Sequence, residues 1–542
     1  MKCRGFTSLS VSGFLTVLTA TSGFLPAAMA QSSAASFAKG AAARVLLPAP
    51  AGEFESCYIP KHYAEYAGSE DDRKEEIKLC RMSGYDLGEL KIEMNTPASI
   101  DSKLFKKLDT KSIVFCPKLN STVPATNFID LPKGWKPEAA QEAFCKLRAD
   151  VPVKLDEFYS LEAKLKSTLG GASTRSVIAY YHFSRLLDTG RVAPAVLRTL
   201  RRGSHEIVVG HAKAALAGGT DYITQNWSAL ESTNQRAASG RANSELYTDA
   251  GAQIYGALME NEKGEEKHTE VSGVGDFKTR YQRFMTQPPF MRLSNPDSAV
   301  NIAGSNRIEK LAPVIVEMRD MAGMILLDTL LSQADRIGNV HYKIAIIENT
   351  ANGAIAREMN KEEKAAAKGV LAAVRAPLYK QSQAAFEKGN TRAAANLRAR
   401  ADRIKMTEKM VVDGIRKLDP SRSPIAAKII IMKDNDAGIS GKNPMRMHSA
   451  LEQVRHMDPD MYRRFLLLAD EILSDRFKSF ATDTLLFRAK DYEGTPTSLK
   501  ENTRHALNVL KTACRNGQLN FDLTMKFDAR GVQIPQPAPS CD

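Results

Sequence analysis

The chain of 542 residues is 43% hydrophobic and carries a formal net charge of +13. This hydrophobic content is sufficient for a buried core, and the length predicts two or three domains, or one large domain with insertions. The positive charge favours anionic partners such as phosphates, acidic proteins, lipid headgroups or nucleic acid, although it would also serve solubility alone. After residue 30 no long uncharged apolar run occurs, which excludes a transmembrane segment in that part of the sequence.

The first 30 residues have the three parts of a cleavable secretory signal. Lys2 and Arg4 form a positive start, an apolar stretch follows, and residues 28–30 read Ala-Met-Ala, the small-x-small pattern of a cleavage site. A membrane anchor is the alternative, but Pro26 and the small residues favour cleavage. We therefore expect an exported protein, periplasmic or secreted, that starts at Gln31. Loss of the two signal cations would lower the charge from +13 to +11.

Cysteine usage agrees with export. Cys3 leaves with the signal, and an even number of cysteines remains from the 7 in the sequence, which predicts disulfides. A zinc site is disfavoured because no Cys-x-x-Cys occurs. The connectivity cannot be deduced from sequence alone, but proximity favours the pairs Cys57–Cys80, Cys116–Cys145 and Cys514–Cys541.

The mature chain changes character along its length. Residues 31–52 are rich in Ala, Ser and Pro and are typical of a flexible lead-in. Residues 53–150 hold four cysteines and indicate a disulfide-pinned N-terminal cap. Residues 357–417 combine strong helix formers with dense charge, which predicts an exposed helical hairpin inserted between two strands.

Hydrophobic periodicity predicts the other main elements. Strands are expected at 159–165, 192–200, 343–347 and 428–432. Helices are expected at 179–187 and 311–331 and through most of 445–515.

Several familiar motifs are missing from the sequence. It contains neither a Gly-x-x-x-x-Gly-Lys-Ser/Thr phosphate loop nor a Gly-x-Ser-x-Gly nucleophile elbow. His205 and His211 are six residues apart, whereas paired metal ligands on one helix face are four apart. The run at 207–209, Ile-Val-Val, also predicts a strand there.

Two short polar clusters follow apolar elements. Residues 333–339 (QADRIGN) come after the expected helix, and residues 434–438 (DNDAG) come after the expected strand at 428–432. If the strands at 343–347 and 428–432 pair as a hairpin, both clusters lie at one end of the sheet. Asp335, Asn339 and Asp434 could then converge, and their oxygens suit a hard divalent cation such as Mg²⁺ or Mn²⁺. Both clusters are also ordinary turn sequences.

The order of these elements resembles the atypical kinases related to secretory-pathway Golgi casein kinases, HipA-type kinases and phosphatidylinositol kinases. Those kinases carry an Asp-Arg-His-x-x-Asn-like catalytic loop, then a hairpin, then an Asp-Asn-Gly or Asp-x-Gly metal motif. The resemblance spans roughly residues 155–515. It implies an α+β fold, namely a kinase-like two-lobed domain with an N-lobe-like region at 151–310 and a mainly helical C-lobe-like region at 311–542.

The resemblance also implies roles for individual residues. Asp335 would be the catalytic base or the carboxylate that orients the substrate. Asn339 and Asp434 would be metal ligands, with Asp436 as the alternative because the metal motif fits in two registers. Lys164 or Lys166 would contact the phosphates of ATP or another nucleotide.

The sequence departs from the family in the catalytic loop, and Ser176 and Val177 stand near the place where a glutamate is expected to pair with the lysine. The loop histidine is replaced by Ile337, and Asn339 comes one position early. Three functions therefore stay open: an exported kinase acting on a protein or another hydroxyl substrate, an inactive kinase-like scaffold, and a non-enzymatic binding protein of the cell envelope. Because ATP is scarce outside the cytoplasm, an active enzyme would need an ATP-containing compartment or another phosphoryl donor.

Overall fold

The computed structural model describes residues 55–59, 63, 70–82, 90–94, 113–119, 121, 123–130, 145, 160–166, 173–242, 246–247, 251–260, 264–272 and 279–542. The expected signal peptide at 1–30, the lead-in at 31–52 and much of the expected cap at 53–150 lie outside these residues. The described residues form a mixed α+β structure with two sheets, which confirms the expected fold class at that level.

Two of the expected disulfides are present, Cys116–Cys145 and Cys514–Cys541. They close loops of 29 and 27 residues, and by chain entropy a bridge across such a loop contributes about 3.5 kcal/mol. Cys80 is also disulfide-bonded. The side chain of Cys57, its expected partner, lies outside the described part of the chain. Among the described helices, none is both long enough and apolar enough to cross a membrane.

The first sheet has the strand order β2-β1-β7-β8-β5-β4-β3. Its strands are β1 (Glu55–Ile59), β2 (Leu90–Met94), β3 (Ile113–Pro117), β4 (Ala125–Asp130), β5 (Ser160–Lys166), β7 (Ala195–Arg201) and β8 (Gln253–Glu260). β1 and β2 pair in parallel, and the other neighbours are antiparallel. Residues of this sheet share an apolar core around Trp227 with α2 (Glu70–Met82), α5 (Arg202–Ala215) and α6 (Tyr222–Ala238).

The second sheet has the order β11-β10-β12-β6, with β9 pairing with β10. Its strands are β6 (Arg191–Val192), β9 (Glu266–Lys267), β10 (Val340–Thr350), β11 (Gly353–Glu358) and β12 (Ile425–Met432). β10 and β12 are antiparallel, with Val340 opposite Met432. The residues just before β10 and just after β12 therefore lie at the same end of the sheet.

The largest core surrounds α4 (Thr174–Leu187) and α11 (Ile308–Leu330). Ser173 caps the start of α4 by accepting a hydrogen bond from the Ser176 amide at 3.4 Å. Outside the insertion, the other described helical elements are α7 (Thr269–Ser272), α8 (Arg280–Met285), α9 (Pro288–Leu293), α10 (Ala299–Ala303), η4 (Asn435–Ala437), α15 (Pro444–Met447), η5 (Leu451–Gln453), α16 (Pro459–Leu473), α17 (Lys478–Asp483), α18 (Ala489–Tyr492) and α19 (Leu499–Arg515).

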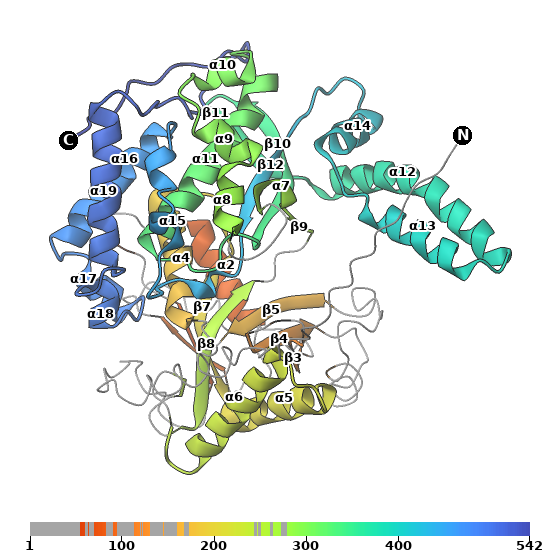
Figure 1. Ribbon diagram of the computed structural model, residues 1–542, viewed down its shortest axis with the longest axis vertical. Coiled ribbons are helices and arrows are strands. Elements are labelled where there is room, and N and C mark those ends of the chain that lie inside the picture. The colour runs from red at the N-terminus through yellow and green to blue at the C-terminus, as the bar shows by residue number, and fades with distance from the viewer. Residues whose placement is uncertain are drawn as a thin grey trace, which may run out of the picture. The chain divides into compact units, whose positions relative to one another are not determined.

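The insertion between β11 and β12 is helical and has three helices where the sequence predicts two. These are α12 (Lys361–Glu387), α13 (Thr391–Arg403) and α14 (Glu408–Leu418). In Figure 1, α12 and α13 run side by side as a long hairpin. The base of the insertion is not exposed: Ala367, Val411 and Ile415 are buried against the sheet residues Tyr342, Ile344, Ile346 and Ala426.

The expected strand at 207–209 is wrong, because these residues lie within α5. Val208 and Val209 are buried against α6, and this packing outweighs the preference of β-branched residues for strands. His205 is on the same helix, buried, with its Nδ1 3.3 Å from Asn234 Oδ1.

Candidate functional site

The two polar clusters of the sequence meet in the structure. We call residues 332–339 the first loop and residues 433–439 the second loop. The Ala334 amide donates to the Ala437 carbonyl at 3.0 Å, and the Ile439 amide donates to the Leu331 carbonyl at 2.5 Å. Gln333 Nε2 also donates to a backbone oxygen of the second loop, at 3.3 Å. The pairing of β10 with β12 therefore continues as direct contact between the two loops.

A buried ion pair lies beneath the loops. The side chains of Arg336 and Asp328 are both fully buried, with Nε 3.0 Å from Oδ2 and Nη2 3.1 Å from Oδ1. Tyr180 donates its hydroxyl hydrogen to Asp328 Oδ1 at 2.6 Å. Burial raises the pKa of Asp328, while the guanidinium works against that rise. Because the charges are paired and hydrogen-bonded, the cluster is stable in a dry core.

Arg336 also connects the first loop to the second. Its Nη1 donates to the Lys433 carbonyl at 2.5 Å, and its Nη2 donates to Asn435 Oδ1 at 2.7 Å. The amide of Asn435 in turn donates to the Met432 carbonyl at the end of β12, at 3.0 Å. One arginine thus fixes the path of the chain directly after the strand.

Asp335 and Asn339 are in direct contact. Asn339 Nδ2 donates to the Asp335 carbonyl at 2.9 Å and to Asp335 Oδ2 at 3.2 Å. Arg280, from α8, donates to Asp335 Oδ1 at 2.6 Å and also to two carbonyls of the first loop. The Asp335 side chain is 49% exposed, so its carboxylate is both anchored and open to solvent.

Asp434 and Asp436 differ in their surroundings. Asp434 is half-buried, and its negative charge acts on the neighbouring His341. Asp436 is only 4% exposed, and its carbonyl accepts a hydrogen bond from the Ser173 amide, next to α4, at 2.7 Å. The more accessible carboxylate of the second loop is therefore Asp434.

Three residues of the two loops have a strained backbone conformation. Of the seven described non-glycine residues with positive φ, three are Ser332 (52°), Asp434 (50°) and Ile439 (52°). Aspartate tolerates this conformation, but a β-branched isoleucine does so at a cost. Asn502 Nδ2 holds the hydroxyl of Ser332 at 2.7 Å. Such strain persists only where the surroundings enforce it, and it is frequent at functional sites.

The second loop presses closely against α4. A Cβ at Gly438 would overlap Ser176 Oγ and would come within 2.9 Å of the Tyr180 ring. The Ser176 hydroxyl also donates to the Asn435 carbonyl. Glycine is required at this position because of the close approach, since its φ of −83° is ordinary.

Lys164 and Lys166 lie on β5 of the first sheet, two residues apart and hence on one face of the strand. They pair in register with Met259 and Ala257 of β8. Their side chains are outside the described part of the chain. The backbone places them on the strand that precedes α4.

The structure brings several of the predicted site residues onto two loops that touch each other. Asp335 and Asn339 are in direct contact, and the loop that carries Asp434 and Asp436 lies against theirs. Within the described residues, however, no three His, Cys, Asp or Glu side chains are grouped closely enough to hold a metal ion by themselves. A metal here would need the amide oxygen of Asn339 and oxygens from a ligand.

The sequence analysis missed the supporting residues. Arg280, Asp328 and Tyr180 reach the two loops from α8, α11 and α4. Tyr180 and Asp328 are 148 residues apart, so no local pattern could have joined them. The available signal was one acidic residue, Asp328, in a run at 324–331 that is apolar apart from Asp328 and Thr329.

Comparisons of the chain with models of protein families, with curated proteins and with solved structures found no match.

Proposed function

We propose that this protein is an exported, atypical kinase-like protein that binds a nucleotide with Mg²⁺ or Mn²⁺ and transfers a phosphoryl group to a protein or another hydroxyl substrate. The observation that carries the proposal is the direct contact between the first and second loops at one end of β10 and β12. Catalytic and metal motifs must act on the same phosphate, so they have to lie side by side.

The side chains at the loops suit a hard cation. Within the described residues, Asn339 Oδ1 accepts no hydrogen bond, because the amide nitrogen is the atom turned toward Asp335. Asp434 is accessible on the adjacent loop. We infer that Asn339 and Asp434 would hold the metal, with Asp436 as the buried alternative. A bound metal would neutralise negative charge on the transferred phosphate.

Asp335 is the best candidate for the carboxylate that receives or orients the substrate hydroxyl. Arg280 and Asn339 hold it in one place while half of its surface stays open. A base must be fixed and yet accessible to the incoming group. Lys164 or Lys166 would contact the nucleotide phosphates from β5.

The order of the structural elements supports a two-lobed arrangement of the kinase type. An antiparallel run of β3, β4 and β5 precedes α4, and β8 then pairs with β5. A mainly helical region follows from α7 onward and contains both loops. We propose that the first sheet with α4 forms the N-lobe and the remainder forms the C-lobe.

An inactive, kinase-like scaffold is the second candidate. The ion pair between Arg280 and Asp335, at 2.6 Å, favours it because the cation occupies one oxygen of the proposed base. A scaffold would bind nucleotide without transferring phosphate. A non-enzymatic binding protein of the envelope would neither bind nucleotide nor transfer phosphate. Export itself is supported by the disulfides, which form in oxidising compartments.

The deciding experiment measures nucleotide binding by thermal shift and calorimetry, with ATP and GTP, each with Mg²⁺, Mn²⁺ or chelator. We expect metal-dependent binding that Asp434→Asn abolishes. Asparagine keeps the size and the tolerance for positive φ, whereas alanine at φ 50° would add strain of about 1 kcal/mol. If the Asp434→Asn variant is folded and binds nucleotide normally, the second loop is a structural turn and the proposal fails.

Asp335→Asn separates the kinase from the scaffold. It should leave nucleotide binding unchanged and should lower phosphoryl transfer by about 10²-fold or more, because a base acts on the hydroxyl and not on the metal. Transfer is measured from ATP and GTP to a generic protein acceptor and to the chain itself. Wild-type protein that binds nucleotide but transfers nothing from either donor would support the scaffold.

A further inference from the structure

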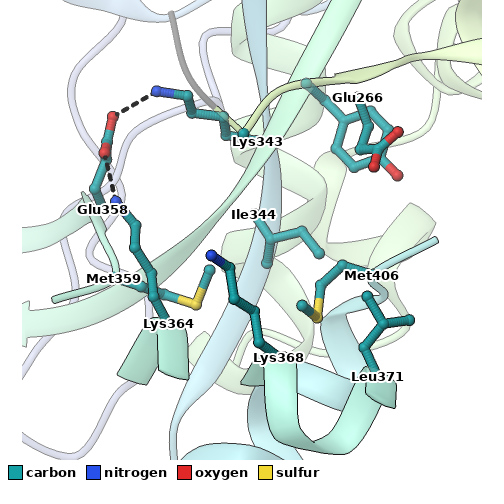
Figure 2. Close-up of a pocket in the computed structure, with 11 residues that line it drawn as sticks. Glu266, Lys343, Ile344, Glu358, Met359, Lys364, Lys368, Leu371 and Met406 are labelled. Carbon is teal, nitrogen blue, oxygen red and sulfur yellow. Dashed lines mark hydrogen bonds and ion pairs between the residues drawn. The ribbon is translucent and has the colours of Figure 1, made fainter. Parts of the chain in front are cut away.

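A cavity of about 350 Å³ lies where the insertion meets the second sheet. This volume is within the range of about 300–1,000 Å³ that is typical of small-molecule sites. Its walls come from β10, the segment around β9, α12 and the segment before α14 (Figure 2). The apolar part of the lining comprises Tyr342, Ile344, Met359, Leu371 and Met406.

One rim of the cavity is a compact ion cluster. Glu358 lies 3.1 Å from Lys343 Nζ and 3.3 Å from Lys364 Nζ, and it is also paired with Arg191. Burial alone would raise the pKa of Glu358, but Arg191 and Lys343 hold it below its ordinary value. This single carboxylate therefore faces three cations, and it remains ionised at neutral pH.

The other acidic group of the lining is also engaged. Glu266, on β9, pairs with Lys405 at 2.8 Å. Each carboxylate at the cavity thus has at least one cation of its own. The charged groups around the cavity carry more positive than negative charge, which favours an anionic occupant over a cationic one.

Lys368 differs from the other cations of the lining. It lies one turn after Lys364 on α12, and its ammonium points into the cavity beside Ile344 (Figure 2). Among the described residues it forms no ion pair or hydrogen bond, in contrast to its neighbours Lys343 and Lys364. An ammonium over an apolar cavity offers one charge-assisted contact to a ligand whose body is hydrophobic.

We propose that this cavity is a binding site for an amphipathic organic carboxylate, held by Lys368 at its charged end and by Ile344, Leu371 and Met406 along its apolar body. One ammonium available to a ligand balances one negative charge, which favours a monocarboxylate over a phosphate dianion. The proposal does not depend on the proposed phosphoryl transfer, since the described residues that line the cavity include none from either loop.

The test is calorimetric titration of the full mature protein with octanoate, with octylamine as the probe of opposite charge. We expect saturable binding of octanoate and none of octylamine. Lys368→Met keeps the aliphatic stem and removes the charge, and should weaken octanoate binding about five- to tenfold, as for a partly exposed charged contact. Lys380→Met is the matched control, because Lys380 is exposed on the same helix outside the cavity.

Met406→Trp tests the cavity itself, because the larger ring would fill the space from a half-buried position. Octanoate binding should be lost while the melting temperature without ligand stays within a few degrees of wild type. The proposal is overturned if octanoate does not bind, if octylamine binds as well, or if the two lysine variants behave alike. Should the Met406→Trp variant fail to fold, the comparison of the two lysine variants decides alone.

Discussion

Arg336 Nη2 donates to Asn435 Oδ1 across 2.7 Å and thereby ties the loop before β10 to the loop after β12. Both side chains are almost completely buried. The same guanidinium is paired with Asp328, which also accepts from Tyr180. A single residue thus joins α11, the first loop, the second loop and, through Tyr180, α4. The geometry of the proposed site therefore depends on a group that cannot itself contact a ligand.

Replacing this arginine should be strongly destabilising. Arg336→Met would leave Asp328 as a buried carboxylate without its cation, and the free energy of unfolding should fall by about 3–5 kcal/mol. Denaturant unfolding followed by circular dichroism measures the change. The double variant Arg336→Met/Asp328→Leu should be more stable than the single one, since it has no unpaired charge. A single variant within about 1 kcal/mol of wild type would contradict this account.

The meeting of the two loops was predictable because it rests on local signals. Short apolar runs marked the strands now seen as β10 and β12, and the polar clusters stood close to their ends. Antiparallel pairing of the two strands then places residues 339 and 433 at the same end of the sheet. The insertion interrupts this pair in sequence without disturbing it, because its helices return the chain to β12 after α14.

The supporting contacts were not predictable, because they join residues far apart in sequence. Arg280 reaches Asp335 across 55 positions, and Ser176 reaches Asn435 across 259. The packing of α14 against the second sheet is similar: Val411 and Ile415 are four residues apart on a charge-rich helix. Such a helix is typical of a solvated surface, and only the fold reveals that one face of it is covered.

Gly438 should not tolerate a side chain. A Cβ there would overlap Ser176 Oγ and contact the Tyr180 ring too closely. Gly438→Ala should therefore force the second loop away from α4 and lower the free energy of unfolding by about 1–3 kcal/mol. Gly441→Ala is the matched control, because it lies three residues on and no atom of the described residues comes within 4 Å of its Cβ position. Thermal unfolding of both variants decides the matter, and equal melting temperatures would show that the contact with α4 is loose.

Because of Asp320, the folded protein should be more stable at acidic pH than at neutral pH. Its carboxylate accepts a hydrogen bond from the Ile430 amide at 2.8 Å, and burial raises its pKa to about 7. Between pH 4 and pH 7 the folded chain keeps this proton while the unfolded chain releases it, so stability falls as pH rises. Asp320→Asn keeps the acceptor oxygen without the titration. The free energy of unfolding of this variant relative to wild type should rise by about 3 kcal/mol on going from pH 4 to pH 7.

The measurement is denaturant unfolding at several pH values, with Asp460→Asn as the control for loss of one surface carboxylate. Asp460 is largely exposed at the start of α16, where it pairs with Arg463. The control should keep the wild-type slope between pH 4 and pH 7. If Asp320→Asn keeps that slope as well, Asp320 is ionised in the folded chain and the assignment is wrong.

His268 should act in the opposite sense. Its ring is 1% exposed and lies 5.0 Å from the ring of Tyr342, and neither ring nitrogen has a hydrogen-bond partner among the described residues. Burial, with help from the nearby Lys428, lowers its pKa to about 4. Between pH 6.5 and pH 4 the His268 imidazole binds a proton in the unfolded chain but stays neutral in the folded chain. Stability is therefore lost as pH falls through this window.

His268→Leu should therefore flatten the acid side of the stability profile. At pH 8 the variant should be at least as stable as wild type, because burying unpaired ring nitrogens costs about 1–3 kcal/mol that leucine avoids. At pH 5 its advantage over wild type should be larger than at pH 8. Asp320→Asn is the natural comparison, since its advantage grows as pH rises and that of His268→Leu grows as pH falls. A leucine variant that loses stability at both pH values would mean that the imidazole makes a polar contact in the folded protein, and the buried, neutral histidine inferred here would have to be abandoned.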